Sequence, residues 1–289
     1  MAYSTLIAPE ALAPHLGDPA WAIVDCRFAL EDTGWGERAY AVAHIPGAVY
    51  AHLDRDLSGI KTGRNGRHPL PTREIVAGTF SRLGIDEATQ VVAYSAQTDM
   101  FSARLWWMLR WLGHDRAAVL DGGFDRWTAE GRPVRAGLEA RTPRTFTARE
   151  RPGMLVEGAA VAKLLGNEQW RLVDARAPER YRGEIEPLDA RAGHIPGAVD
   201  FPYRQTVNGS GNLLSREELR RAFESVMAGV APNQVVCYCG SGVSACQDLL
   251  ALEHAGLTGA KLYAGSWSEW SSDPARPIEV GEAAKTRSK

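Results

Sequence analysis

A cysteine stands where an apolar strand meets a glycine-rich loop. Residues 235–238 read Val-Val-Cys-Tyr, Cys239 follows them, and Gly-Ser-Gly over residues 240–242 leads into a helical stretch. The backbone N–H groups of such a loop, and of a helix N-terminus, can point inward and stabilise an anion. Because the thiolate is the nucleophilic form of cysteine, this arrangement predicts an activated thiol at Cys239.

The residues that follow Cys239 suit a loop that curls around an anion. Gly240 and Gly242 permit the left-handed backbone conformation that such a curl needs. Ser241 can donate or accept a hydrogen bond at the ligand. We therefore assign the role of nucleophile to Cys239. We expect the substrate to bind along the loop and the start of the helix, at Gly240, Gly242, Val243, Ser244 and Ala245.

Three other interpretations of this cysteine are weaker. A cysteine phosphatase has five residues and then a phosphate-clamping arginine after its thiol, and the corresponding residue here is Ala245. A metal site would combine Cys239 with Cys237, Cys246 and His254, but Cys237 and Cys239 alternate along a strand and face opposite ways. A buried, inert cysteine leaves the Gly-Ser-Gly run unexplained. We therefore predict no bound metal and no cofactor.

The chain contains the same unit twice. His-Ile-Pro-Gly-Ala-Val occurs at residues 44–49 and again at 194–199, and Val-Val-Ala-Tyr at 91–94 returns as Val-Val-Cys-Tyr at 235–238. In each copy, short β-branched runs alternate with stretches of helical periodicity. Such alternation is typical of an α/β fold with a mainly parallel sheet that helices cover on both faces. We therefore predict two tandem α/β domains.

Individual elements follow from the pattern of apolar residues and from glycines that end helices. The predicted strands span residues 21–25, 90–94 and 117–120 in the first copy, and 171–174, 233–238 and 261–263 in the second. The predicted helices span residues 73–83, 100–112 and 244–254.

Only the second copy carries the thiol. Alignment of the two copies places Ser95 at the position of Cys239, and the sequence shows no base beside Ser95. We therefore predict an inactive N-terminal domain, residues 1–144, which supplies groups to the cleft between the domains, and a catalytic C-terminal domain, residues 145–289. A linker rich in Thr, Arg and Pro marks the boundary.

Composition and charge limit the classes of partner. The 289 residues include 33 Lys and Arg against 35 Asp and Glu, for a net charge of −2, so neither nucleic acid nor a membrane is an expected partner. No apolar run reaches transmembrane length, and the N-terminus lacks the basic start and apolar core of a signal peptide. Four cysteines are not a disulfide framework in a chain of this length. We therefore predict a cytoplasmic protein.

Together, these segments resemble those of the two-domain rhodanese sulfurtransferases. The resemblance rests on the repeated His-Ile-Pro-Gly-Ala-Val, on Cys-Gly-Ser-Gly-Val-Ser-Ala in the second copy alone, and on Gly-Ser-Trp-Ser-Glu-Trp at residues 265–270; it covers about residues 5–280. It implies a rhodanese-like fold in each half and a ping-pong reaction. The thiolate would take a sulfane sulfur from a donor, form a persulfide on Cys239, and pass the sulfur to cyanide or a thiol.

The resemblance also implies a set of residues around the thiol. Arg180 is similar to the arginine that binds the donor's carboxylate or sulfonate. Ser241, Asp56 and His68 are similar to the polar groups that handle protons. The family's second arginine lies in a Pro-Glu-Pro-Arg segment that this chain lacks, and Arg191 is the candidate to replace it.

The loop sequence favours one donor. Mercaptopyruvate sulfurtransferases have Cys-Gly-Ser-Gly-Val-Thr-Ala, which this chain matches with Ser244 in place of Thr, whereas thiosulfate-using rhodaneses have basic residues directly after the cysteine. The resemblance therefore implies 3-mercaptopyruvate as the donor, with thiosulfate:cyanide sulfurtransferase activity as an alternative. A further hypothesis is a non-catalytic sulfur-relay module that a partner protein loads. The expected partners are a small sulfur donor, cyanide or a thiol as acceptor, and a thioredoxin-like reductant.

Overall fold

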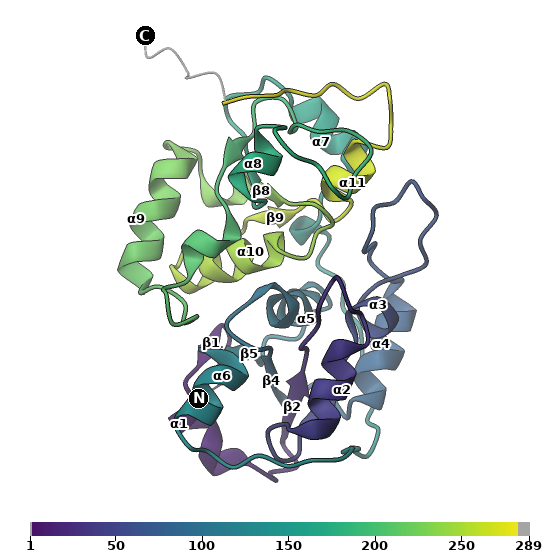
Figure 1. Ribbon diagram of the computed structural model, residues 1–289, viewed down its shortest axis with the longest axis vertical. Coiled ribbons are helices and arrows are strands. Elements are labelled where there is room, and N and C mark those ends of the chain that lie inside the picture. The colour runs from purple at the N-terminus through teal and green to yellow at the C-terminus, as the bar shows by residue number, and fades with distance from the viewer. Residues whose placement is uncertain (1, 283–289) are drawn as a thin grey trace. The chain divides into compact units, whose positions relative to one another are not determined.

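The computed structural model describes residues 2–282, and this part of the chain forms two compact units (Figure 1). The first unit contains residues 2–59, 70–152 and 207–214, and the second contains residues 60–69, 153–206 and 215–282. Each unit thus includes a short segment from the other half of the sequence. The predicted boundary between residues 144 and 145 differs from this division, in which the first unit extends to Pro152.

A five-stranded sheet organises the first unit. Its strand order is β1–β5–β4–β2–β3, and every neighbouring pair is parallel. The strands are β1 (Leu6–Ile7), β2 (Trp21–Asp25), β3 (Val49–Tyr50), β4 (Gln90–Tyr94) and β5 (Ala117–Leu120). Every residue of the central strand β4 is buried, as expected for a parallel strand that is covered on both faces.

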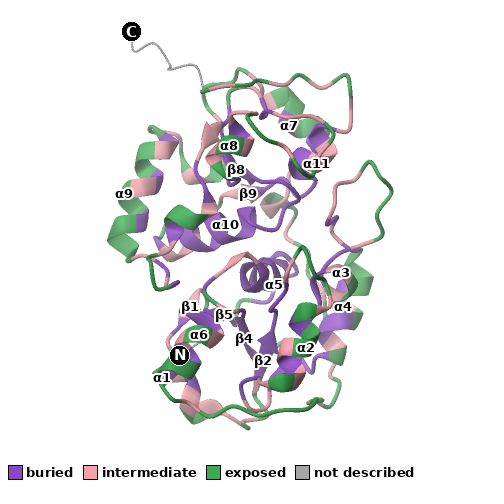
Figure 2. Ribbon diagram, in the orientation of Figure 1, coloured by how far each residue is buried: buried purple, intermediate pink, exposed green. Residues whose placement is uncertain are grey.

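Helices cover this first sheet. They are α1 (Pro9–Leu12), α2 (Trp35–Val42), α3 (Leu53–Asp56), α4 (Arg73–Arg82), α5 (Met100–Trp111) and α6 (Gly123–Ala129), with a 3₁₀ turn η1 (Ala13–His15). Leu12 of α1 and Trp127 of α6 join Ile23 and Val92 of the sheet in one core cluster. α5 packs against β4 and β5 and is almost entirely buried (Figure 2). This burial requires the apolar Met-to-Trp run that the sequence has there.

The second unit repeats this arrangement with four strands. The order is β7–β6–β8–β9, again all parallel. The strands are β6 (Arg171–Asp174), β7 (Val199–Asp200), β8 (Val235–Tyr238) and β9 (Lys261–Leu262). A parallel bridge from Leu155 to Leu262 lies at the β9 edge, where β1 lies in the first sheet. The two sheets therefore have the same strand order.

Helices also cover the second sheet. They are α7 (Gly158–Leu164), α8 (Pro178–Tyr181), α9 (Arg216–Met227), α10 (Ala245–His254) and α11 (Ser266–Trp270), with the 3₁₀ turns η2 (Pro152–Met154), η3 (Tyr203–Thr206) and η4 (Pro232–Gln234). Val161, Tyr181 and Trp267, from α7, α8 and α11, share one core cluster with Val236 of β8. α10 packs against β8, β9 and α9.

The predicted fold class, two α/β domains with mainly parallel sheets, is confirmed. The predicted strands and helices are also present, with ends that differ by a residue or two. The strand predicted over residues 233–238 begins only at Val235, because the proline at 232 starts the turn η4.

The repeated histidines fasten the loop that precedes a strand. His194 stacks on Tyr181 with ring centroids 3.8 Å apart, and its Nδ1 lies 2.8 Å from the Tyr181 carbonyl oxygen. His44 and Tyr40 show the same two contacts, at 4.2 Å and 2.8 Å. Because both histidines are buried and each serves its own unit, these contacts explain the repeated motif without any link to the thiol.

Candidate active site

Cys239 directly follows β8 and is 1% exposed. The backbone N–H of Gly242 donates a hydrogen bond to its sulfur, with N and Sγ 3.1 Å apart. Gly242 has a φ of +74°, and a Cβ there would lie 2.4 Å from the carbonyl oxygen of Ala264. Only glycine fits this position. The loop then enters α10, where the N–H groups of Cys246 and Gln247 donate to the carbonyl oxygens of Val243 and Ser244, at 3.1 Å and 3.0 Å. The predicted strand, cysteine, loop and helix are therefore arranged to stabilise an anionic sulfur.

Backbone hydrogen bonds fix the loop to the start of α11. The carbonyl oxygens of Cys239 and Gly240 accept from the N–H groups of Trp267 and Ser268, at 2.9 Å each. The Cys239 N–H donates to Ser266 Oγ at 3.1 Å. Ser266 has a φ of +54°, which is uncommon for a residue other than glycine. The Gly-Ser-Trp-Ser-Glu-Trp segment thus positions the loop that carries the thiol.

His68 lies at the thiol loop although it is 173 residues from Ser241 in sequence. His68 Nδ1 and Ser241 Oγ are 2.8 Å apart, and both side chains are buried. The segment that carries His68, residues 60–69, belongs to the second unit. Next to it, the Arg67 N–H donates to Ser268 Oγ at 3.0 Å. An imidazole that is hydrogen-bonded to a hydroxyl can move a proton, and proton transfer by this pair, which the resemblance implies, stays a prediction.

Two guanidinium groups face Gly240, the residue after the thiol. A Cβ at Gly240 would lie 2.7 Å from Nη2 of Arg67 and 3.3 Å from Nη1 of Arg180. The Nη2 group of Arg180 donates hydrogen bonds to the carboxylates of Glu186 and Asp189, at 2.6 Å and 3.0 Å. Arg67 also pairs with Asp189. The sequence analysis names Arg180 for this site but not Arg67. The position of Arg67 directly before His68 is the feature of the sequence that could have indicated it.

The guanidinium group of Arg191 is held by the end of the second unit. It donates to the carbonyl oxygens of Ser271 at 2.9 Å and of Arg276 at 3.3 Å, and to that of Asp273. The Arg191 carbonyl in turn accepts from Trp267 Nε1 at 2.8 Å. These contacts use the donors that a substrate carboxylate would need. They favour a structural role, and substrate binding by Arg191 stays a prediction that the contacts do not support.

Asp56 ends α3 in the first unit. Its carboxylate accepts from the backbone N–H of His52 at 2.8 Å and pairs with Arg82. Both oxygens therefore have partners within that unit. The part in proton transfer that the sequence predicts for Asp56 stays a prediction.

Val243, Ser244 and Ala245 complete the turn into α10 and are buried. Ser244 is the N-cap residue, and its side chain accepts no capping hydrogen bond from the helix. Their predicted contacts with substrate would run through backbone N–H groups. These contacts, too, stay predictions.

A buried carboxyl group lies near the thiol on α10. Asp248 is fully buried, and among the described residues neither of its side-chain oxygens has a hydrogen-bond partner. Burial, and after it the negative charge of Cys239, raise the pKa of Asp248 well above its usual value. The uncharged acid is therefore the stable form. A protonated Asp248 places no negative charge beside the sulfur anion.

The other cysteines are buried in the cores of their units. None of Cys26, Cys237, Cys239 and Cys246 takes part in a disulfide. Burial raises the pKa of Cys26 and of Cys237 well above the usual thiol value, so these two stay protonated and unreactive. In residues 2–282, no group of three or more His, Cys, Asp or Glu side chains is placed to hold a metal ion.

The first unit fixes the start of its matching loop by the same backbone hydrogen bonds, without the thiol. The carbonyl oxygens of Ser95 and Ala96 accept from the N–H groups of Phe124 and Asp125, both at 2.8 Å. Cys239 and the residue after it make the same pair of bonds in the second unit. The predicted equivalence of Ser95 and Cys239 is therefore confirmed, and the first unit has a hydroxyl where the second has a thiol.

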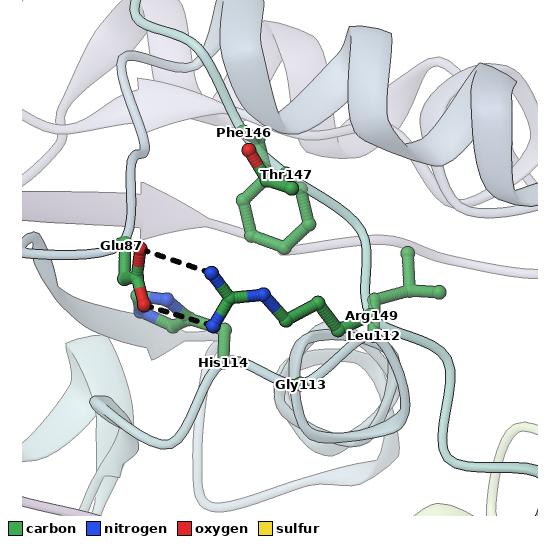
Figure 3. Close-up of a pocket in the computed structure, with 7 residues that line it drawn as sticks. All are labelled: Glu87, Leu112, Gly113, His114, Phe146, Thr147 and Arg149. Atoms are coloured by element: carbon green, nitrogen blue, oxygen red, sulfur yellow. Dashed lines mark hydrogen bonds and ion pairs between the residues drawn. The ribbon is translucent and has the colours of Figure 1, made fainter.

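A separate hollow in the first unit has no such chemistry (Figure 3). It is lined by Glu87, Leu112, Gly113, His114, Phe146, Thr147 and Arg149. The Arg149 guanidinium donates to both carboxylate oxygens of Glu87, at 3.0 Å and 3.5 Å, which leaves this pair neutral (Figure 3). Burial lowers the pKa of His114, which favours the uncharged ring. None of these lining residues is a thiol, so the hollow offers no site for sulfur transfer.

The length and composition of the described helices show whether any of them could cross a membrane. None of those within residues 2–282 combines the length and the apolar composition needed to cross a bilayer.

Comparison with known proteins gives consistent results. The family model of the rhodanese-like domain matches residues 8–130 and 158–273. The "Probable 3-mercaptopyruvate sulfurtransferase" of Pseudomonas aeruginosa is 42% identical over 284 residues, which are 98% of this chain and 100% of the relative. The "Thiosulfate/3-mercaptopyruvate sulfurtransferase 1, mitochondrial" of Arabidopsis thaliana is 32% identical, over 96% of this chain and 79% of its own. The solved structure of the 3-mercaptopyruvate sulfurtransferase from Leishmania major has a TM-score of 0.82 and 31% identity, over 93% of this chain and 74% of that one.

Proposed function

This chain belongs to the rhodanese-like family, with two copies of the domain, and on that premise we propose that it is a sulfurtransferase that carries sulfur as a persulfide on Cys239. One observation carries the proposal: the Gly242 N–H donates to the Cys239 sulfur at 3.1 Å. Oriented N–H donors of this kind stabilise a charge without reorganisation during the reaction. The matching loop of the first unit begins with Ser95 and has no sulfur to activate.

The first half-reaction loads the thiol. The Cys239 thiolate attacks the sulfur of 3-mercaptopyruvate, a new S–S bond forms, and the donor's C–S bond breaks with its electron pair on carbon. The donor's own S–H proton stays on the transferred sulfur, and the enolate of pyruvate takes a proton to become pyruvate. The His68–Ser241 pair is suited to supply this proton, because Ser241 lies in the thiol loop and His68 can reload it.

The second half-reaction unloads the thiol. Cyanide or a thiolate attacks the terminal sulfur, which leaves as thiocyanate or as a new persulfide. The S–S bond to Cys239 breaks, and its electron pair returns to Cys239 as the thiolate. Since the Gly242 N–H donates to this same sulfur, it stabilises the leaving group of this step as well as the nucleophile of the first.

We favour 3-mercaptopyruvate as the donor because of the guanidinium N–H groups that face the thiol loop. The loop itself has no basic side chain, but Arg67 and Arg180 face its first residue, Gly240. Paired guanidinium groups suit a carboxylate. The Pseudomonas relative is named for this donor and the Arabidopsis relative for both donors. Thiosulfate is accordingly the second candidate, with sulfite as the leaving group.

The proposal includes a cytoplasmic location and a thioredoxin-like protein as a reductant of the persulfide. None of the four cysteines takes part in a disulfide, which suits a compartment that keeps thiols reduced. A pull-down of persulfidated protein with a thioredoxin active-site variant tests the reductant. Cell fractionation tests the location.

The test of the activity is direct. Donor treatment is expected to add the mass of one sulfur atom to the peptide that contains Cys239. Cys239→Ser is expected to lose both this mass and all transfer, whereas Cys26→Ala, a buried cysteine of the first unit, keeps both. Substantial transfer by Cys239→Ser contradicts the assignment. Loading only by a persulfidated protein, and by neither small donor, favours the relay hypothesis. The ratio of kcat/KM values for the two donors ranks them.

A further inference from the structure

The pair Arg67 and Arg180 presents one nitrogen each to the thiol loop. These are Nη2 of Arg67 and Nη1 of Arg180, the two side-chain atoms nearest to a Cβ placed on Gly240. The other arm of each guanidinium is bound to carboxylates: Arg67 through Nη1, and Arg180 through Nε and Nη2. Among the described residues, the two nitrogens that face the loop have no hydrogen-bond partner. The carboxylates therefore aim both guanidiniums at the residue beside the thiol.

The carboxylates of Glu186 and Asp189 are built into the fold. Both side chains are only 3% exposed. Glu186 Oε1 accepts from the backbone N–H groups of Leu188 and Asp189, at 3.1 Å and 3.2 Å, which orders the turn between them. Asp189 is the shared member, because it pairs with Arg67 through one oxygen and with Arg180 through the other.

The charges of this network cancel. Glu186 also accepts from Arg176 at 3.2 Å, and Arg176 is bound by Asp174. The connected set therefore has three arginines and three carboxylates, and no net charge. The two loop-facing nitrogens keep the geometry that a carboxylate needs. A ligand gains little further attraction from a second negative charge, because that attraction depends on net charge more than on hydrogen-bond geometry.

We propose that Arg67 is a second donor-binding residue beside Arg180, and that Asp189, by neutralising this pair, makes the site prefer a singly charged donor to a doubly charged one. The inference rests on the proposed function and adds its specificity. A 3-mercaptopyruvate molecule presents one carboxylate, whereas thiosulfate is a dianion. The negative charge of Asp189 repels the thiosulfate dianion about twice as strongly as it repels a single carboxylate. Asp189 therefore lowers kcat/KM for thiosulfate relative to that for 3-mercaptopyruvate.

Two variants shift this ratio in opposite directions. Asp189→Asn keeps the shape of the side chain and removes one negative charge, so kcat/KM for thiosulfate is expected to rise about tenfold relative to that for 3-mercaptopyruvate, equivalent to about 1.4 kcal/mol. Arg67→Gln removes one positive charge and is expected to lower the same ratio about tenfold while it raises KM for both donors. Glu184→Gln is the matched control: Glu184 is exposed, pairs with Arg182, and its loss leaves the ratio unchanged.

The outcomes separate this inference from the proposed function. If wild-type protein forms no persulfide with either donor, the proposed function fails. If wild-type protein reacts but Asp189→Asn lowers both kcat/KM values equally, Asp189 only positions the arginines and the inference is overturned. A ratio in Arg67→Gln that equals the wild-type value overturns it as well, even where Asp189→Asn does not fold. If Glu184→Gln changes the ratio of the two kcat/KM values as much as Asp189→Asn does, the effect is one of overall charge, and the inference is overturned too.

Discussion

The Gly242 N–H is the group on which the chemistry of the thiol depends most, and replacement of this glycine tests that dependence. In Gly242→Ala, the new Cβ would lie 2.4 Å from the carbonyl oxygen of Ala264, in a residue whose φ is +74°. The left-handed conformation costs an alanine about 1 kcal/mol. The clash adds to this cost, because the backbone fixes the position of the Cβ and the carbonyl oxygen is itself a backbone atom, so no side-chain rotation can relieve the contact. The loop must therefore shift away from Ala264.

This displacement of the loop weakens the hydrogen bond from residue 242 to the Cys239 sulfur. The N–H···Sγ hydrogen bond is 3.1 Å long, and a displacement of roughly half an ångström with a change of direction weakens such a bond severely. A hydrogen bond to a charged acceptor contributes about 1.5–3 kcal/mol. Loss of this stabilisation is expected to lower the rate of persulfide formation about 10- to 100-fold. Single-turnover mixing with donor, followed by mass spectrometry of Cys239, measures this rate.

Two other glycines serve as controls. Gly197 has nearly the same φ, +75°, but a Cβ placed on it would meet open space, so Gly197→Ala is expected to lose about 1 kcal/mol of stability and none of the rate. At Gly240 a Cβ would meet only guanidinium tips, the nearest being Nη2 of Arg67 at 2.7 Å. Gly240→Ala is therefore expected to raise KM for the donor and to preserve kcat. Full persulfide formation by folded Gly242→Ala would refute the reasoning.

Three further predictions concern single side chains. His68→Gln keeps a hydrogen bond to the loop but cannot relay a proton, so kcat with 3-mercaptopyruvate is expected to fall about 100-fold and kcat with thiosulfate much less; equal losses in steady-state assays would contradict proton transfer. Arg191→Met deprives several carbonyl groups of their donor and is expected to lower the free energy of unfolding by about 3 kcal/mol without a change in donor KM; a raised KM at unchanged stability would restore Arg191 as a substrate residue. Burial raises the pKa of Asp99 to about 6, above its value of ~3.9 in the unfolded chain. Its contribution to the free energy of unfolding is therefore fully present below pH ~3.9 and is lost as the pH rises through about 6, by up to about 3 kcal/mol. Urea unfolding followed by tryptophan fluorescence should show this loss between pH ~4 and ~6 in the wild type and not in Asp99→Asn, and equal pH profiles would count against it.

The fold could be predicted because its signals are local. Apolar runs of strand length gave β4 and β8 directly, and a glycine after each helical stretch gave the ends of α4 and α5. The repeat then extended each assignment to the other copy. The equivalence of Ser95 with Cys239 holds down to the two backbone hydrogen bonds that follow each residue. Local pattern and duplication together therefore determine most of the architecture.

The surroundings of the thiol could be predicted only in part, because they depend on contacts between distant segments. No periodicity indicates that residues 60–69 pack with the second unit, or that Arg67 reaches the residue after Cys239. The partners of Arg180 were equally hidden, since Asp189 lies on a turn without regular structure. Resemblance supplied His68 and Arg180. It did not supply the acidic residues that decide what charge those groups present.

The loops after Ser95 and after Cys239 are each covered by a segment from the other half of the sequence, and these two segments differ in their functional side chains. In the first unit this cover is residues 207–214: the Thr98 N–H donates to the Gly211 carbonyl at 3.0 Å, and the Leu213 N–H donates to Asp121 at 3.0 Å. This segment reads Val-Asn-Gly-Ser-Gly-Asn-Leu-Leu and contains neither His nor Arg. Residues 60–69, which lie with the second unit, bring both. The first unit therefore lacks the thiol, and the segment that covers its loop brings neither an imidazole nor a guanidinium group to Ser95.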